Sequence, residues 1–223
     1  MEKYYKTIIK IYLMKLSSII IKFFRQKSSR VLPQRLFSSS GFSLFSPKRL
    51  HEILKLDSLK GETKDRVKEI WTSYANHKNN QLLCGTLDPV LDTCIRARGL
   101  QCSLFIYPVF RSDESFFMML SQFQENVFVV TYLEDYKKNP SNARPWLQLT
   151  LYDELVNEKD IGLYRADFIP ELTATESRKV VEMIVQAYTD DEAFKLVSTF
   201  NTNPQRFNFD EFLKFFKSSY RRS

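Results

Sequence analysis

The chain has 223 residues, with 33 basic and 26 acidic side chains and only five glycines. This length suits one domain, with or without a tail, and can bury a sizeable core. Nine basic residues and one acid fall within residues 1–37, which leaves 24 basic and 25 acidic residues in the rest. The basic character therefore belongs to the N-terminus, which argues against a nucleic-acid-binding body.

Residues 1–37 are rich in Ser, Ile, Leu and Phe as well as Lys and Arg. On a helical wheel the basic residues share about half of the circumference, and apolar residues supply the other side. This composition is typical of a mitochondrial transit peptide. The run from Arg35 to Ser38 resembles a matrix-processing site, so we expect a mature start near Ser38 and a flexible lead-in over 38–46. A membrane span over 8–24 is the rival, but three lysines interrupt it, and we expect no stable membrane insertion.

The main domain is expected over 47–217, and it opens with helices. A first short helix ends near Gly61, and a second carries Trp71 on its inward side. A third helix is predicted over 82–98, with Gly99 as its C-terminal stop. Its inward-facing residues are expected to be Leu83, Leu87, Val90, Leu91 and Cys94.

Three runs of aromatic and β-branched residues lie between Gln101 and Tyr136, separated by polar breaks at 111–115 and 124–126. This pattern predicts three adjacent antiparallel strands. Successive side chains of a strand point to opposite faces, and here both faces are apolar. The sheet therefore needs cover on both sides, from this chain or from a partner.

The rest of the chain adds strands and then helices. After a short helical turn and a loop over 133–145, Trp146 to Tyr152 alternates between apolar and polar residues, which indicates a half-buried strand, and 159–168 offers another. Three helices follow: one opening at a capping box of Thr173 and Glu176, and two over 190–199 and 209–217. This order predicts an α+β fold, with a mainly antiparallel sheet of about five strands flanked by N-terminal and C-terminal helices.

Residues that could carry chemistry are few. The sequence has no phosphate-binding glycine loop, GxSxG or HExxH, and its three cysteines and two histidines show no zinc-site spacing. The acid pairs at 113–114 and 134–135 favour turns or strand ends over acid–base catalysis. Arg111 could bind an anion or a carboxylate, although a solvated strand end is the simpler account. We expect no enzyme activity, catalytic residue, cofactor or metal.

Six motifs occur in a fixed order between residues 47 and 217: Phe105–Arg111, Phe116–Phe117 with Gln122–Phe123, Val130–Lys137, Ala143–Pro145, Lys159–Leu163 and Phe200–Phe207. As a set they resemble the mitochondrial ATP synthase F1 complex assembly factor 1 family, the chaperones of the β subunit. The chain departs from that family at Asp160 and after Leu163, which affects the placement of that strand. The resemblance implies a mitochondrial matrix protein that holds unassembled β subunit, and it implies neither catalysis nor a bound nucleotide.

A chaperone must offer apolar surface to its client, and aromatic and Met side chains suit that task. We therefore hypothesise that the hairpin over 116–132, or its edge, contacts the β subunit, with strand addition as one route. The alternative is that helices from both ends of the chain cover both faces of the sheet. The candidate client-binding residues are Phe116, Phe117, Met118, Met119, Phe123, Phe128 and Tyr132.

Two other functions stay open. A mitochondrial RNA-binding protein would need a basic stripe beside stacking aromatics. Lys137, Lys138 and Arg144 could form a local patch, but the near-neutral body argues against RNA, and we expect no nucleic-acid partner. A hydrolase would need a pocket of converging polar side chains.

Overall fold

A computed structural model describes residues 47–77, 81–112 and 115–222. The predicted transit peptide and lead-in, residues 1–37 and 38–46, lie outside these ranges and stay predictions. In the described part of the chain, no helix is long and apolar enough to cross a membrane.

The described residues form one six-stranded sheet in which every neighbouring pair is antiparallel. The strand order is β1-β6-β5-β4-β3-β2, so β1 and β2 are the two edges. This confirms the α+β fold with a mainly antiparallel sheet, with six strands where about five were expected. The strands are β1 (Leu82–Leu87), β2 (Leu104–Phe110), β3 (Phe116–Gln124), β4 (Val127–Tyr132), β5 (Pro145–Tyr152) and β6 (Gly162–Phe168).

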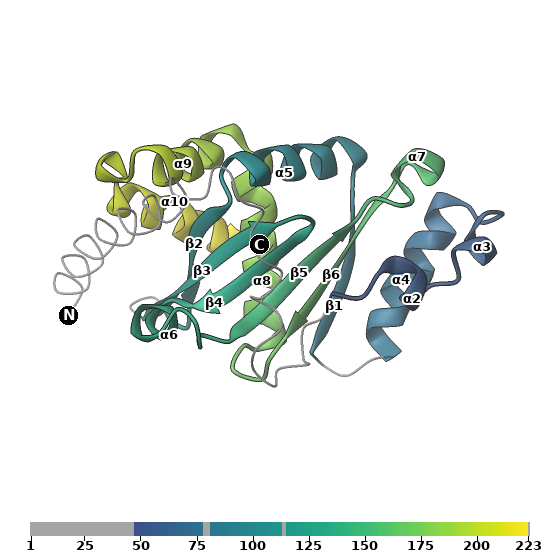
Figure 1. Ribbon diagram of the computed structural model, residues 1–223, viewed down its shortest axis with the longest axis horizontal. Coiled ribbons are helices and arrows are strands. Elements are labelled where there is room, and N and C mark those ends of the chain that lie inside the picture. The colour runs from purple at the N-terminus through teal and green to yellow at the C-terminus, as the bar shows by residue number, and fades with distance from the viewer. Residues whose placement is uncertain (1–46, 78–80, 113–114, 223) are drawn as a thin grey trace.

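Helices from both ends of the chain flank this sheet (Figure 1). The long helix α8 crosses behind the strands, α9 and α10 gather near β2, and α2, α3 and α4 lie beside β1. The bounds are α2 (Leu50–Ile53), α3 (Leu56–Leu59), α4 (Lys64–His77), α5 (Pro89–Gln101), α6 (Leu133–Lys138), α7 (Val156–Lys159), α8 (Ala174–Thr189), α9 (Asp191–Thr202), η3 (Pro204–Arg206) and α10 (Phe209–Arg222).

The main core lies between the sheet and the C-terminal helices. Phe105 of β2 is fully buried, and its ring lies 5.6 Å from that of Phe200, 5.7 Å from that of Phe212 and 6.1 Å from that of Phe216. Edge-on and tilted aromatic contacts of this kind stabilise a core beyond simple area burial. Much of the aromatic richness of the sequence is therefore core packing.

A second, smaller core joins α2–α4 to the β1 side of the sheet. Trp71 of α4 is fully buried, as predicted, and its indole N–H donates to the carbonyl oxygens of Gly85 and Tyr164 at 3.1 Å each. Leu50, Val67 and Leu163 pack in the same cluster. These contacts fix α4 against β1 and β6.

The prediction of one helix over 82–98 is wrong. Residues 82–87 form strand β1, and α5 begins at Pro89 with Asp88 as its N-cap. A short apolar run does not distinguish a strand from a buried helix, whereas Pro at the first helical position does mark a helix start. Gly99 does not stop α5 either, because the helix continues to Gln101.

Candidate binding surface

The β3–β4 hairpin lies inside the sheet. β3 pairs with β2 and β4, and β4 pairs with β3 and β5. Both edges of both strands are therefore occupied. The strand-addition route at this hairpin is wrong, and any added strand has to use β1 or β2.

The seven predicted contact residues differ in exposure. Four of them are at most 5% exposed: Met118, Met119, Phe123 and Phe128. The Phe128 ring lies 4.5 Å from that of Phe123 and 5.2 Å from that of Tyr188 on α8. These four side chains belong to the core: α8 covers Phe128 through Tyr188, and Phe123 lies against Gly99 of α5. Client contact through this set stays a prediction for Phe116, Phe117 and Tyr132, which are half-buried.

Phe117 and Tyr132 form a half-buried aromatic cluster with Trp146. The Tyr132 and Trp146 rings stack at 4.9 Å, and each lies 5.9 Å from the Phe117 ring. Trp146 lies where the β4–β5 register shifts, because Val130 pairs with Leu147 whereas the next residue pairs with Pro145. Sequence reasoning assigned Trp146 only to an alternating strand, since no pattern signals such a shift.

The indole N–H of Trp146 is buried and has no hydrogen-bond acceptor among the described residues. An unsatisfied buried donor costs about 1–3 kcal/mol. The cluster of Phe117, Tyr132 and Trp146 therefore combines apolar ring surface with one unused polar group.

Arg111 borders this cluster. Its guanidinium lies 4.8 Å from the centre of the Phe117 ring and donates to the Glu176 carboxylate at 2.9 Å and to the Glu171 carbonyl at 3.2 Å. Arg111 does bind a carboxylate, as one of the two sequence interpretations proposed, but that carboxylate belongs to this chain.

Glu176 completes the capping box predicted at the start of α8. It accepts from the Thr173 backbone N–H at 2.8 Å, and its own N–H donates to the Thr173 hydroxyl at 3.1 Å. Burial alone would raise the pKa of Glu176, but the hydrogen bonds from Thr173 and Arg111 outweigh it and hold the pKa below the ordinary value. The Glu176 carboxylate is therefore ionised, and it ties the start of α8 to Arg111 at the end of β2.

A second apolar surface lies on α5, at the other end of the sheet (Figure 1). Among the described residues the exposed large hydrophobic side chains are Val90, Leu91 and Leu100, at 74%, 39% and 72% exposure. The sequence prediction that Val90 and Leu91 face inward is wrong. Val90, Ala97 and Leu100 are spaced by seven and three residues and so share one side of the helix, which we call the α5 stripe.

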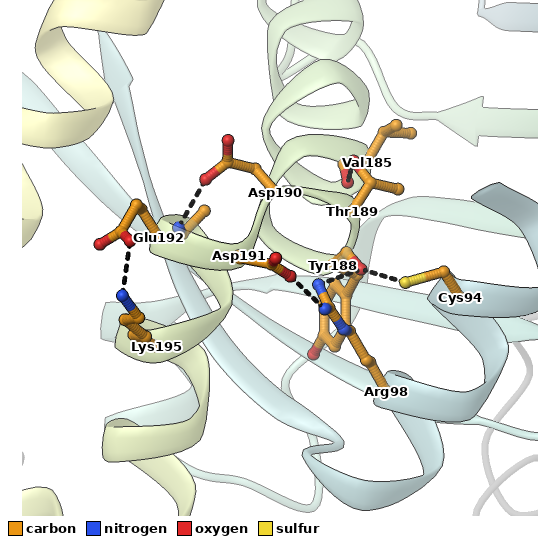
Figure 2. Close-up of polar contacts among 10 residues, drawn as sticks. Cys94, Arg98, Val185, Tyr188, Thr189, Asp190, Asp191, Glu192 and Lys195 are labelled. Carbon is orange, nitrogen blue, oxygen red and sulfur yellow. Dashed lines mark hydrogen bonds and ion pairs between the residues drawn. The ribbon is translucent and has the colours of Figure 1, made fainter.

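The helix that carries the α5 stripe is firmly held (Figure 2). The Cys94 thiol and the Arg98 guanidinium both donate to the Tyr188 carbonyl at the end of α8, each at 3.3 Å. Arg98 also forms an ion pair with Asp191. At the other side of α5, Arg96 donates to the side-chain oxygen of Asn126, between β3 and β4, and pairs with the buried Asp92 of its own helix at 2.7 Å. The exposed stripe is therefore displayed by a fixed helix.

Within the described ranges no three His, Cys, Asp or Glu side chains group as metal ligands. The cysteines are free thiols, and burial raises the pKa of Cys84 to about 12, which keeps that thiol neutral at physiological pH.

The geometry defines a class of protein: an α+β domain that displays apolar side chains on a fixed helix and on a half-buried aromatic cluster. The chain belongs to the ATP11 protein family, whose family model matches residues 26–213. The family resemblance inferred from the six ordered motifs is thereby confirmed.

Three curated relatives carry the name ATP synthase mitochondrial F1 complex assembly factor 1. The protein from Danio rerio is 25% identical over 163 residues, covering 72% of this chain and 53% of the relative. The proteins from Mus musculus and Homo sapiens are each 26% identical, covering 86% and 85% of this chain and 58% and 56% of those relatives. The chain thus spans little more than half the length of these relatives.

Proposed function

We propose that this chain is a mitochondrial matrix chaperone that binds the unassembled β subunit of ATP synthase F1 and prevents its aggregation during assembly. The ATP11 family assignment and the names of the relatives support a role in F1 assembly. The predicted transit peptide supports the compartment. In this role the protein works by binding and performs no reaction.

The exposure of Val90 and Leu100 carries the proposal. Both are large apolar side chains, more than 70% exposed, on a helix that two hydrogen bonds to Tyr188 and an ion pair with Asp191 hold in place. Burying each such side chain against a partner is worth about 1.5–3 kcal/mol. Phe116, Phe117 and Tyr132 are proposed as a second client contact at the other end of the sheet.

Replacing Val90 and Leu100 together by Asp tests this role. We expect the affinity for β subunit diluted from denaturant to fall at least tenfold, because two charges replace the apolar contact. Lys68→Asp is the control, since it changes the net charge by the same amount at an exposed site on α4. Equal affinity of the double variant and the control would remove the α5 stripe from the client contact.

RNA binding receives less support. Lys137 pairs with Glu134 at 2.6 Å, and Arg144 pairs with Glu171. Acidic partners thus neutralise two of the three residues of the predicted basic patch. Steep salt dependence of RNA binding by the full chain would be needed to favour this function.

A further inference from the structure

The two edge strands, β2 and β1, differ in whether their outward backbone groups have hydrogen-bond partners. The Phe123 N–H donates to the Ser103 carbonyl at 2.7 Å, which sets the alternation of the antiparallel ladder. Leu104, Ile106, Pro108 and Phe110 therefore direct their backbone polar groups outward, away from β3.

At three of these four residues, a backbone group that an added strand would need is already bonded or is absent. The Asn201 side chain accepts from the Leu104 N–H at 3.2 Å and donates to the Leu104 carbonyl at 2.6 Å, as a neighbouring strand would. Pro108 has no N–H to offer. The Tyr220 hydroxyl donates to the Phe110 carbonyl at 3.1 Å. Such features are how proteins prevent unwanted pairing at a sheet edge.

Strand β1 lacks these features. The Phe168 N–H donates to the Gln81 carbonyl at 3.1 Å, so by the same alternation Leu82, Cys84 and Thr86 direct their backbone groups outward. No strand or side chain of the described residues bonds to these outward groups. The six residues of β1 include neither proline nor a charged side chain, and all but Leu87 are partly exposed.

Apolar surface continues from this edge onto α5. The strand ends at Leu87, and the exposed side chains of Val90 and Leu91 follow within four residues. An added strand would thus find backbone donors and acceptors along β1 and apolar contacts at its end.

A second copy of this chain is a poor occupant. If two β1 strands paired antiparallel about a twofold axis, the α4 helix that packs on each β1 would lie on the same side of the joined sheet. Paired strands stand about 4.8 Å apart, whereas packed helices need about 8–10 Å between their axes. An extended segment with no helix of its own avoids this crowding.

We propose that the outer edge of β1 takes up an extended segment of the unassembled β subunit as a seventh strand of the sheet. This inference rests on the proposed function and specifies its recognition mode. Backbone bonds at Cys84 and Thr86 bind the segment with little dependence on its sequence, and Val90 and Leu91 favour an apolar residue near its end.

Thr86→Pro tests the proposal in the full chain, because proline removes the outward N–H of Thr86 and places its ring in the path of an added strand. Thr86→Val is the matched control, since valine has nearly the same shape and keeps the N–H. We expect capture of β subunit, diluted from denaturant, to weaken at least tenfold in the proline variant and less than twofold in the valine variant. Equal capture by both variants, each folded by circular dichroism, overturns the proposal.

Amide hydrogen exchange of the unsubstituted chain gives a readout that does not depend on a variant. We expect the Cys84 and Thr86 amides to exchange quickly in the free protein and at least tenfold more slowly in the complex with β subunit. A complex that forms without this protection overturns the β1 site and leaves the proposed function standing. Failure to form any complex contradicts both. Protection that rises with protein concentration alone identifies a second copy as the occupant and also overturns the proposal.

Discussion

Asn201 replaces a strand at the edge of β2. Its amide group satisfies both the N–H and the carbonyl of Leu104, and it also donates to the Val197 carbonyl at 2.8 Å. One side chain from α9 therefore satisfies backbone groups of two elements. Removing it leaves partly buried polar groups without partners, which is more costly than losing a solvent-exposed bond.

We expect Asn201→Ala to lower the free energy of unfolding by about 1–3 kcal/mol, because the N–H and the carbonyl of Leu104 lose their partner. Urea unfolding measures this change. Thr202→Ala is the neighbouring control at an exposed site, and it should cost about 0.5 kcal/mol or less. A loss for Asn201→Ala no larger than that for the control would show that the edge does not need the amide group.

Glu176 makes stability depend on pH. The pKa of Glu176 in the folded protein lies below the ordinary value of 4.5. The stability that its ionised carboxylate contributes is therefore present above pH 4.5 and is lost as the pH falls through the folded pKa. We expect Glu176→Gln to be less stable than the unsubstituted protein at pH 7, and the gap to narrow as the pH falls below about 4.5. Urea unfolding at pH 7 and at pH 3 checks this. A gap of constant size would mean that the charge of Glu176 contributes nothing.

At the scale of elements, Gly99 of α5 has a packing role. A Cβ atom at Gly99 would stand 2.6 Å from the Phe123 ring, so the ring can lie against α5 only because the side chain is absent. Alanine favours a helix over glycine by about 1 kcal/mol, but the overlap with Phe123 is expected to exceed that gain.

We therefore expect Gly99→Ala to lower the free energy of unfolding by about 1–3 kcal/mol despite its better helix propensity. Gly61→Ala is the matched control, because no atom lies within 4 Å of a Cβ added there. Thermal unfolding of both variants measures the difference. Stabilisation by Gly99→Ala would show that the contact between α5 and β3 is loose.

The sequence predicts some elements better than others. The three aromatic runs between Gln101 and Tyr136 became β2, β3 and β4, because polar breaks and β-branched residues separate strands clearly. The capping box of Thr173 and Glu176 opens α8 as predicted. Leu83 and Leu87 fit helical spacing and so favour a helix over 82–87, whereas Asp88 and Pro89 mark where the helix begins.

The candidate surface was harder to predict than the strands. Four of the seven predicted contact residues are core. The sequence does not separate them from the other three, because apolar residues on both faces of a strand do not reveal which helices cover it. Helical spacing predicts that Val90 faces inward, whereas the structure exposes it on the α5 stripe with Leu100. The open edge of β1 depends on strand order, which local pattern does not determine.

At the scale of the whole molecule, a closely packed aromatic core coexists with a few large apolar side chains that are exposed on α5. The C-terminal helices bury the aromatic face of the sheet, and Asn201, Pro108 and Tyr220 close the edge at β2. At the other edge, the outward backbone groups of β1 have no partner among the described residues, and the α5 stripe is exposed. The described body thus displays apolar side chains on α5 and, at the other end of the sheet, in the half-buried cluster of Phe117, Tyr132 and Trp146.

The most direct test of the chaperone account is the solubility of the isolated β subunit. Denatured β subunit is diluted into buffer with and without the full chain, and light scattering follows aggregation over time. We expect roughly equimolar full chain to suppress the scattering, and an equal amount of an unrelated protein of similar size to leave it unchanged. Scattering that is unaffected by a severalfold excess of the chain would contradict the account.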